Sequence, residues 1–288
     1  MTRDNHRDAD ACARFLKAGL IISHLLVLTA AAWTSESGQA GDGLAQRRVF
    51  VMGTWLDVEV RARSNDAAHR VAGVMIETVE TAENRLSTWG DSSELSRING
   101  SPVGAWCELS ALLAIDLEEA WRWQQATEGA FSPRVGSLIE AWGLRSGGRV
   151  PSAAEIRRAL ELSSADRLEL SQGRVRRLDE GAWIEEGAFG KGAALRDAAR
   201  AAVAAGASCV VLDFGGQTAV AGRCGLVRIA LSDPNRRQSA IATLALPEGS
   251  VATSGNSERS LEVADRRLGH LIDPRSGMPA PDWGSVTV

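Results

Sequence analysis

The sequence contains no tyrosine and has few lysines, histidines and cysteines. Because none of its 288 residues is Tyr, acid–base chemistry by a phenol is excluded. Only two lysines occur, Lys17 and Lys191, and every other basic side chain is an arginine. Such a preference for arginine makes Lys191 a candidate for a specific role. The formal net charge of −4 gives no general attraction for nucleic acid or for an anionic membrane surface.

The four cysteines do not form a recognisable framework. Cys12 lies in the N-terminal region, and no C-x-x-C pair occurs among the other three, so neither a disulfide scaffold nor a zinc site is indicated. Cys209 lies in the apolar segment SCVVLDF, which favours a role in core packing. Cys107 and Cys224 are the pair that we expect to bond if the protein enters an oxidising compartment.

The N-terminal residues have the pattern of a targeting segment. In residues 1–34 several basic side chains precede an apolar run and a group of small residues, which is typical of a signal peptide. The run is short for a membrane-spanning helix, and an uncleaved N-terminal anchor is the alternative. We expect residues 35–46 to be a linker and 47–288 to be the folded domain. The expected location is the periplasm or the outer face of the inner membrane.

The segment IEEGAFGKGAALRD (184–197) predicts a strand end, a glycine-rich turn and a helix. The alanine-rich residues 193–205 favour the helix, and Gly206 ends it. The start of a helix presents N–H groups without intrahelical partners, which suits an anion. Lys191 lies in this turn and is a candidate phosphate contact; a solvated lysine is the alternative. No Ser or Thr follows it, so the segment is not a Walker A loop.

Caps, periodicity and turn residues predict the other elements. Helices are expected to begin at Asp66, at Ser92 or Ser93, at Ser110, at Ser132 with Pro133 in the first turn, and at Ser152, whose capping box is completed by Glu155. Strands are expected at 48–63 with a bend at Gly53, at 168–171 and 175–178 joined by Gln172-Gly173, and at 208–214, 226–231 and 240–246.

Three further residues are candidate ligand contacts. Asn99 ends a polar segment that is a plausible rim of a binding site. Phe131 lies beside an expected helix start, where a core role or a ring contact is reasonable. His270 lies near Asp273 in a loop rich in Gly and Pro, and it is a better candidate than His69, which lies on the polar face of a helix. A structural histidine bonded to Asp273 is the alternative.

Seven short motifs follow one another along the domain. They are MGT (52–54), LSTWGDSSELSRIN (86–99), TEGAFSPRVGSLIEAWG (127–143), EEGAFGKG (185–192), LDFGGQTAVAG (212–222), ATSGNSE (252–258) and HLIDPRSG (270–277). Together they resemble the FAD:protein FMN transferases, the ApbE-type flavin transferases. Each motif alone is weak, and their order along the chain carries the resemblance.

The resemblance implies the fold, the reaction and the partners. We expect an α+β fold, with a mostly antiparallel sheet, packed helices and two lobes around a flavin cleft. The implied enzyme is exported, uses FAD as substrate and Mg²⁺ as cofactor, attaches FMN to a Thr or Ser hydroxyl of a target protein, and releases AMP. The implied target is a flavoprotein subunit of an electron-transfer or respiratory complex.

The resemblance also assigns residues to roles. The main-chain carbonyl of Ala188 would bind the metal. Lys191 would hold phosphate charge, and His270 would either transfer a proton or hold phosphate charge. The residues implied to line the FAD site are Met52, Asn99, Ala130, Phe131, Ser132, Glu185, Lys191 and Ile272.

Several positions depart from the usual pattern of the family. Asp is usual at the positions of Glu185 and Ser132, and Thr and Asp are usual at those of Arg134 and Arg196. The sequence ends at SVTV, before the segment whose Asp and Thr complete the magnesium site, so the domain is expected to lack its C-terminal end. The departures leave two alternatives to transfer, a non-catalytic FAD-binding or delivery protein and an FAD pyrophosphatase.

Overall fold

The computed structural model describes residues 33–35, 42–236, 238–256, 260–263 and 266–288. The expected targeting segment lies outside the described residues up to residue 32, as do residues 36–41, half of the expected linker. Residues Trp33–Val288 form one compact unit, so the expected division into two lobes is not confirmed. The α+β fold with antiparallel strands is confirmed. No helix in the described ranges has both the length and the apolar character needed to cross a membrane.

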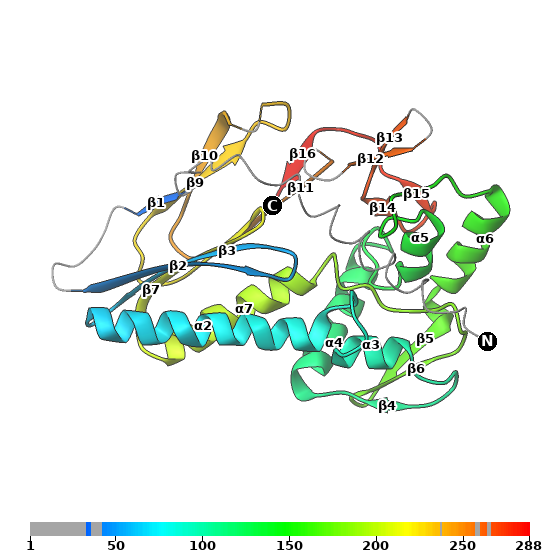
Figure 1. Cartoon of the computed structure of the whole chain (residues 1–288), viewed down its shortest axis with the longest axis horizontal. Helices are drawn as coiled ribbons and strands as arrows, with labels where there is room; N and C mark the ends of the chain where they lie inside the picture. Colours follow the sequence, from blue (N-terminus) through cyan, green and yellow to red (C-terminus); the bar gives the residue numbers. More distant parts are fainter. Residues whose placement is uncertain (1–32, 36–41, 237, 257–259, 264–265) are drawn as a thin grey trace, which may run out of the picture. The chain divides into compact units, whose positions relative to one another are not determined.

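A six-stranded antiparallel sheet forms the centre of the unit (Figure 1). Its strands, in spatial order, are β16 (Ser285–Thr287), β11 (Gly249–Gly255), β8 (Gln217–Gly222), β7 (Ala207–Phe214), β3 (Thr54–Ala62) and β2 (Gly43–Val51). The bend predicted at Gly53 is the β2–β3 hairpin, where Met52 and Gly53 both have positive φ. β2 already begins at Gly43, so the linker predicted for 35–46 extends too far into the domain.

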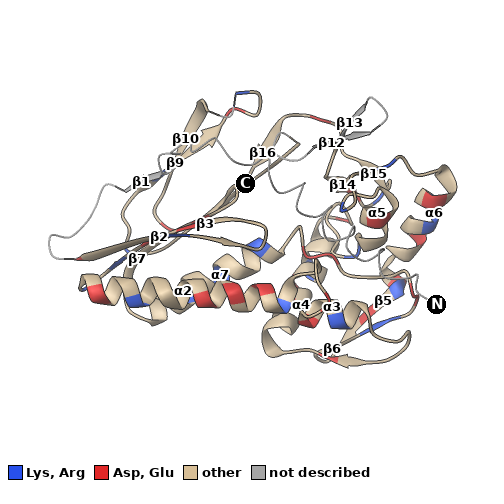
Figure 2. Cartoon of the chain, in the orientation of Figure 1, with Lys and Arg blue, Asp and Glu red and all other residues tan. Residues whose placement is uncertain are grey.

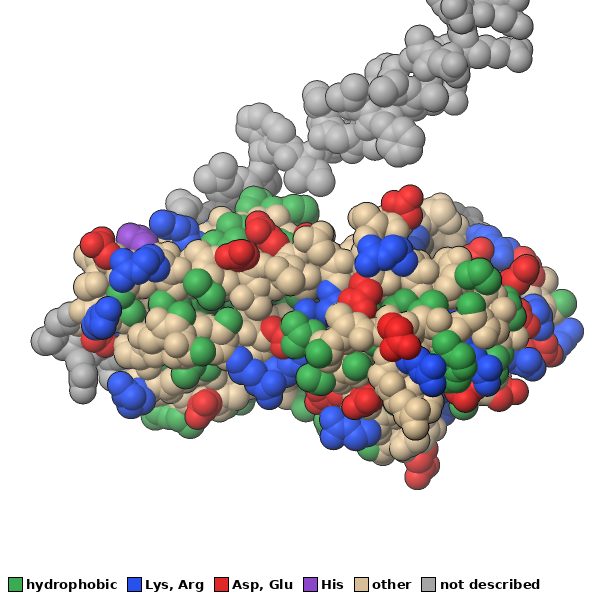
Figure 3. All heavy atoms as spheres, turned by 90° about the horizontal axis from the view of Figure 1, so that it is seen from below, with side chains coloured by type: hydrophobic (Ala, Val, Ile, Leu, Met, Phe, Trp, Pro, Cys, Tyr) green, Lys and Arg blue, Asp and Glu red, His purple; other side chains and the backbone are tan. Residues whose placement is uncertain are grey.

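Two helices, α2 (Asn65–Leu86) and α7 (Gly190–Ala204), pack on one face of this sheet (Figure 1). Alternation along β7 places Val210 and Leu212 in the core beneath these helices, whereas Val211 faces the other side. α2 begins after Ser64, whose hydroxyl accepts a bond from Ala67 N, and the predicted cap at Asp66 is wrong. Charged residues of both signs occur along α2 (Figure 2), and on the face of the molecule seen in Figure 3 charged side chains are mixed with apolar ones.

The opposite face of the sheet carries a disulfide that differs from the expected one. Cys209 and Cys224 both lie in a buried cluster on this face and form a disulfide. Cys107 lies in another sheet and is a free thiol. The predicted pairing of Cys107 with Cys224 is therefore wrong, because sequence alone did not show that β7 brings Cys209 next to the turn after β8.

Four small sheets complete the described strands. They are β1 (Trp33–Ser35), β9 (Val227–Ser232) and β10 (Ala240–Leu246); β4 (Cys107–Glu108), β6 (Arg174–Arg177) and β5 (Leu168–Ser171); β12 (Ser260–Val263) and β13 (Arg266–Gly269); and β14 (Ile272–Asp273) and β15 (Met278–Pro279). All pairings in them are antiparallel. The hairpin predicted around Gln172-Gly173 joins β5 to β6 and is confirmed.

The remaining helices are α3 (Glu94–Asn99), α4 (Ala111–Ala126), α5 (Gly136–Ala141) and α6 (Ala153–Leu162). Ser93, Ser110 and Ser152 cap α3, α4 and α6 as predicted. The cap predicted at Ser132 is wrong, since α5 begins only at Gly136. The Ser132 hydroxyl instead accepts a bond from the main-chain nitrogen of Arg134 at 3.1 Å, within a turn.

Candidate active site

The segment that precedes α7 is fixed by side chains and backbone from distant parts of the chain. Asn99, at the end of α3, forms two hydrogen bonds with the backbone of Ile184: its Nδ2 donates to the carbonyl at 2.8 Å, and its Oδ1 accepts from the amide at 2.9 Å. The next amide, that of Glu185, donates to the carbonyl of Pro133 at 2.8 Å. Two predicted site regions therefore meet at Ile184, although the strand end predicted there is wrong, because residues 182–186 are irregular backbone.

Two adjacent carboxylates, Glu185 and Glu186, follow Ile184, and both are buried. Glu185 forms an ion pair with Arg145, while Glu186 accepts a hydrogen bond from Thr88. The Arg145 guanidinium also donates to Thr88. Burial raises the pKa of Glu185 to about 7, and the neighbouring Glu186 adds to the shift, although Arg145 opposes it. Glu185 is thus poised to change its charge near neutral pH.

A pocket of about 500 Å³ opens beside these carboxylates and is lined by Thr88, Asn99, Arg145 and Trp183, among others. Arg145 lies near two indole rings, with its Cζ 4.7 Å from the centroid of Trp89 and 5.1 Å from that of Trp183. Sequence reasoning missed Arg145 and Thr88 as site residues. Thr88 lies within a recognised motif, but neither residue carried a local signal of a pairing with Glu185 or Glu186.

Lys191 and Met52 lie at the start of α7. The Lys191 ammonium donates to the Gly215 carbonyl at 3.1 Å, so it is held between the helix start and the turn after β7. The Met52 methyl group lies within 3.5 Å of the position that a Cβ on Gly190 would take. Two predicted contacts from distant parts of the sequence are thus adjacent to the helix N-terminus, as an anion site there requires.

Ala130, Phe131 and Ser132 lie in the turn before Pro133. Ala130 is exposed, Phe131 is half-buried and Ser132 is buried. The Phe131 amide donates to the Thr127 hydroxyl at 3.1 Å. The carbonyl of Pro133 connects this turn to Glu185, but none of the three predicted residues lines the 500 Å³ pocket.

His270 and Ile272 lie before and within β14. Ile272 packs against the cluster formed by α5 and α6, and it pairs with Pro279 in β15. Trp142 supports the same region by donating from Nε1 to the Gly277 carbonyl at 2.7 Å. His270 is half-buried. Of all predicted site residues, Asn99 alone lines the 500 Å³ pocket, so Lys191, Phe131 and His270 are not gathered in it.

The described residues do not supply a recognisable donor set for Mg²⁺. Ala188, whose carbonyl is the predicted ligand, is exposed, and the nearest carboxylates in sequence are committed to Arg145 and Thr88. Within the described ranges, no three or more His, Cys, Asp or Glu side chains are grouped so that they could hold a metal ion. Mg²⁺ prefers near-octahedral oxygen coordination, and the described residues by themselves do not complete it.

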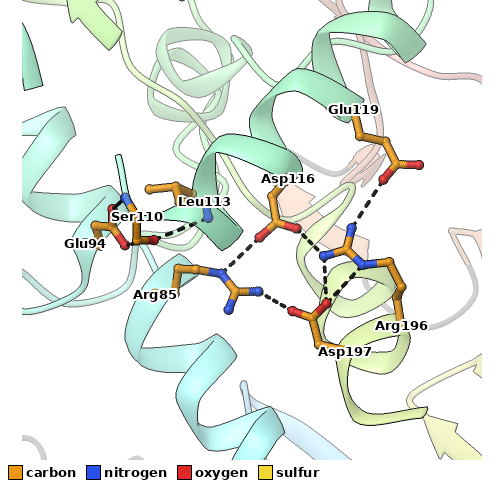
Figure 4. Close-up of polar contacts among 8 residues, drawn as sticks. All are labelled: Arg85, Glu94, Ser110, Leu113, Asp116, Glu119, Arg196 and Asp197. Carbon is orange, nitrogen blue, oxygen red and sulfur yellow. Dashed lines mark hydrogen bonds and ion pairs between the residues drawn. The ribbon is translucent and has the colours of Figure 1, made fainter. Parts of the chain in front are cut away.

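A network of buried charges fixes α7 against α2 and α4 (Figure 4). Arg85 pairs with Asp116 at 3.0 Å and with Asp197 at 2.7 Å. Arg196 pairs with Asp116 at 2.6 Å and with Asp197 at 2.8 Å, and it also reaches Glu119 at 3.2 Å. Arg196, which departs from the usual family pattern, thus belongs to a packed network one and a half turns beyond Lys191.

The fold and these motifs define a domain of the ApbE type. The structure superposes on the ApbE protein from Thermotoga maritima with a TM-score of 0.78 and 28% identity, covering 85% of this chain and 81% of that one. The flavinyl transferase ApbE of Pseudomonas stutzeri has the same fold, with a TM-score of 0.74 and 23% identity over 88% of this chain and 81% of that chain. The profile of the ApbE family matches residues 52–288. The chain is therefore a member of the ApbE family.

Curated relatives carry a functional name. The chain is 30% identical to an FAD:protein FMN transferase of Rhodobacter capsulatus over 99% of this chain and 54% of that protein. It is 26% identical to an FAD:protein FMN transferase of Vibrio cholerae over 70% of this chain and 62% of that protein. The chain thus spans between about half and two thirds of the length of these two relatives.

Proposed function

We propose that this chain transfers FMN from FAD to a Thr or Ser hydroxyl of a target protein and releases AMP. The observation that carries the proposal is the segment from Ile184 to Lys191. Asn99 contacts it at Ile184, Arg145 at Glu185, Met52 at Gly190 and the Gly215 carbonyl at Lys191. Its helix start and ammonium suit a pyrophosphate. The names of the related proteins support the same reaction.

The proposed reaction is a phosphoryl transfer. The target hydroxyl oxygen bonds to the phosphorus of the FMN half, the bridging bond of the pyrophosphate breaks, and AMP leaves with the electron pair. The hydroxyl proton passes to a base or to water. Catalysis of this kind depends mainly on positioning and charge stabilisation. Lys191 and the α7 N-terminus would hold the phosphate charge, and the neighbouring pocket would take a ring of the dinucleotide. His270 remains a candidate for proton transfer or phosphate binding.

Mg²⁺ and the target belong to the same proposal. When bound, Mg²⁺ would neutralise phosphate charge, and the carbonyl of Ala188 is the ligand that the resemblance assigns. We expect the target to be a flavoprotein subunit of an electron-transfer or respiratory complex. Chelation by EDTA should then abolish transfer, and added Mg²⁺ should restore it. Transfer that proceeds at full rate in EDTA would remove the metal from the proposal.

We also propose that the protein is exported, to the periplasm or to the outer face of the inner membrane. The support is the targeting pattern of residues 1–34 together with the buried disulfide between Cys209 and Cys224, because disulfides persist mainly in oxidising compartments. Fractionation of cells that express the full chain tests this proposal. Recovery of a fully reduced protein from the cytosol alone would contradict it.

The decisive experiment mixes the full chain with FAD, Mg²⁺ and a target domain that carries an acceptor Thr. Covalent flavin fluorescence on the target, in equal amount to the AMP released, is the expected result. AMP and free FMN without labelled target would indicate an FAD pyrophosphatase. Tight binding of FAD without either product would indicate a binding or delivery protein. A target whose acceptor Thr is replaced by Ala is the control for non-specific labelling.

Replacing Lys191 by Met is expected to weaken FAD binding by about 10- to 100-fold, because one charged hydrogen bond contributes about 1.5–3 kcal/mol. Riboflavin, which has no phosphate, should bind equally to both proteins. Titrations of flavin fluorescence measure both affinities, and Lys191→Arg is the control that keeps the charge. Equal loss of riboflavin and FAD affinity would instead show that Lys191 supports the local fold.

A further inference from the structure

Arg134 is a buried guanidinium without a carboxylate partner among the described residues. The residue is 5% exposed. Its Nη1 donates to the amide oxygen of Gln124 at 2.6 Å, and its Cζ lies 4.2 Å from the ring centroid of Trp121. Its Nε is buried and has no hydrogen-bond partner in the described part of the chain. The side-chain contacts of this charge within the described ranges are therefore with neutral groups, Gln124 and Trp121.

The contrast with Arg85 shows how unusual this environment is. Arg85 is 6% exposed, almost the same as Arg134, but two carboxylates, Asp116 and Asp197, compensate its charge. Taking an ion out of water is costly unless it is paired and fully hydrogen-bonded. The cation–π contact with Trp121 offsets only part of this desolvation free energy. Burial accordingly lowers the pKa of Arg134 to about 10.

Arg134 also lies next to the segment that carries the proposed function. The preceding residue, Pro133, accepts the hydrogen bond from Glu185. Trp121, on which the guanidinium stacks, and Phe189, the residue just before α7, both pack against the same hydrophobic cluster. Arg134 thus directly follows the residue whose carbonyl fixes the start of the segment that leads to Lys191, and Ser132 adds no carboxylate to neutralise its charge.

We propose that Arg134 binds a phosphate oxygen of the nucleotide, as an additional contact of the site to which the proposed function assigns FAD. A phosphate supplies the missing negative charge. The planar guanidinium suits such an oxygen through a charge-assisted hydrogen bond. The phosphate belongs either to the flavin half of FAD or to the AMP half, and the inference rests on the proposed function for its ligand.

The test compares Arg134→Met with the wild-type full chain. Met removes the charge and keeps an unbranched side chain of similar length. We expect the affinity for FAD to fall at least about 10-fold, the change that corresponds to about 1.4 kcal/mol, while the affinity for riboflavin stays unchanged. The thermal unfolding midpoint should stay the same or rise, because the substitution removes an uncompensated charge. Arg85→Met, of equal burial, should lower that midpoint, because it leaves Asp116 and Asp197 with one fewer cation.

Titrations with FMN and with AMP identify which phosphate is bound. Weaker binding of FMN by Arg134→Met assigns the flavin-side phosphate, and weaker binding of AMP assigns the adenylate-side phosphate; either result supports the inference. Unchanged affinities for FAD, FMN and AMP overturn the inference. They overturn it even if Arg134→Met transfers FMN more slowly because its KM for the target protein is raised. In that case an acidic group of the target is the partner.

Two further outcomes separate this inference from the proposed function. If Arg134→Met binds FAD more weakly than the wild type does, but the wild type labels no target, the inference is supported and the transferase proposal fails. If the wild type labels the target and Arg134→Met binds FAD, FMN and AMP as tightly as the wild type does, the transferase proposal is supported and the inference fails. If Arg134→Met does not fold, Arg134→Gln and Arg134→Lys replace it: a large loss of FAD affinity in Gln and a smaller one in Lys supports the inference, and equal affinities overturn it.

Discussion

Replacing Asp116 by Ala is expected to lower the free energy of unfolding by about 3–5 kcal/mol. Asp116 is 2% exposed and is bound by Arg85 and Arg196, which reach it from α2 and α7 (Figure 4). Without this carboxylate, two guanidinium groups must share Asp197 in a poorly hydrated place. Removing one member of a buried ion pair is costly mainly because the partners remain buried and uncompensated.

Urea or thermal unfolding of the full chain measures this effect, and Arg158→Met is the matched control. Arg158 also forms two ion pairs, with Glu161 and Asp179, but its side chain is 56% exposed. Water already screens such pairs, so the control should unfold almost as the wild type does. Equal effects of the two substitutions would show that burial of the network does not contribute as argued. The Asp116→Ala chain is also expected to lose FAD affinity if α7 shifts with Lys191.

The stability of the wild type is expected to fall by about 3 kcal/mol as the pH rises from about 4.5 to about 7, through the titration of Glu185 alone. The pKa of this carboxyl rises from its ordinary value of 4.5 to about 7 in the folded protein, chiefly through burial and secondly through the charge of Glu186. Below pH 4.5 the group is protonated in both states, and its contribution is fully present. As the pH rises through the folded pKa, the folded protein loses the proton that it held more tightly than the unfolded chain did, and the contribution is lost.

Glu185→Gln removes this titration. The difference in unfolding free energy between Glu185→Gln and the wild type should therefore change by about 3 kcal/mol between pH 4.5 and 8, in favour of Gln at high pH. Denaturant unfolding at a series of pH values measures it. Glu155→Gln is a control that titrates in a lower window: hydrogen bonds from the Ser152 backbone and side chain lower the pKa of Glu155 to about 2, so its effect should appear as the pH falls from about 4.5 to about 2 and should be small above pH 4.5. A pH-independent difference for Glu185→Gln would contradict the raised pKa.

Local features of the fold were predictable because neighbouring residues determine them. Ser93, Ser110 and Ser152 cap helices as predicted, since a cap needs only a short side chain and an amide two or three residues away. The hairpin at Gln172-Gly173 was predictable for the same reason, because both residues take up positive φ in a tight turn. The wrong prediction at Ser132 shows where local signals are insufficient. The Ser132 hydroxyl accepts a hydrogen bond from Arg134 N within a turn, the Pro133 carbonyl accepts one from Glu185 N, and the helix begins only at Gly136.

The candidate site was predictable only in part. The motif around Lys191 and its helix start were visible in sequence, as was Asn99, which lines the pocket. Arg145 was not predicted, because its pairing with Glu185 joins residues forty positions apart. The Cys209–Cys224 disulfide was missed because both cysteines lie in unremarkable segments, and only the antiparallel pairing of β7 with β8 brings them together.

By itself the sequence determined the family, the antiparallel α+β character and the positions of most helix starts and turns, because these depend on motif order, periodicity and residues close together in the chain. The tertiary structure decided which charges are compensated. Arg85 and Arg134 are equally buried, yet only folding places Asp116 and Asp197 beside the first and neutral groups beside the second. The energy of a buried charge depends on what lies within a few ångströms in space, and the linear sequence does not contain that information in readable form.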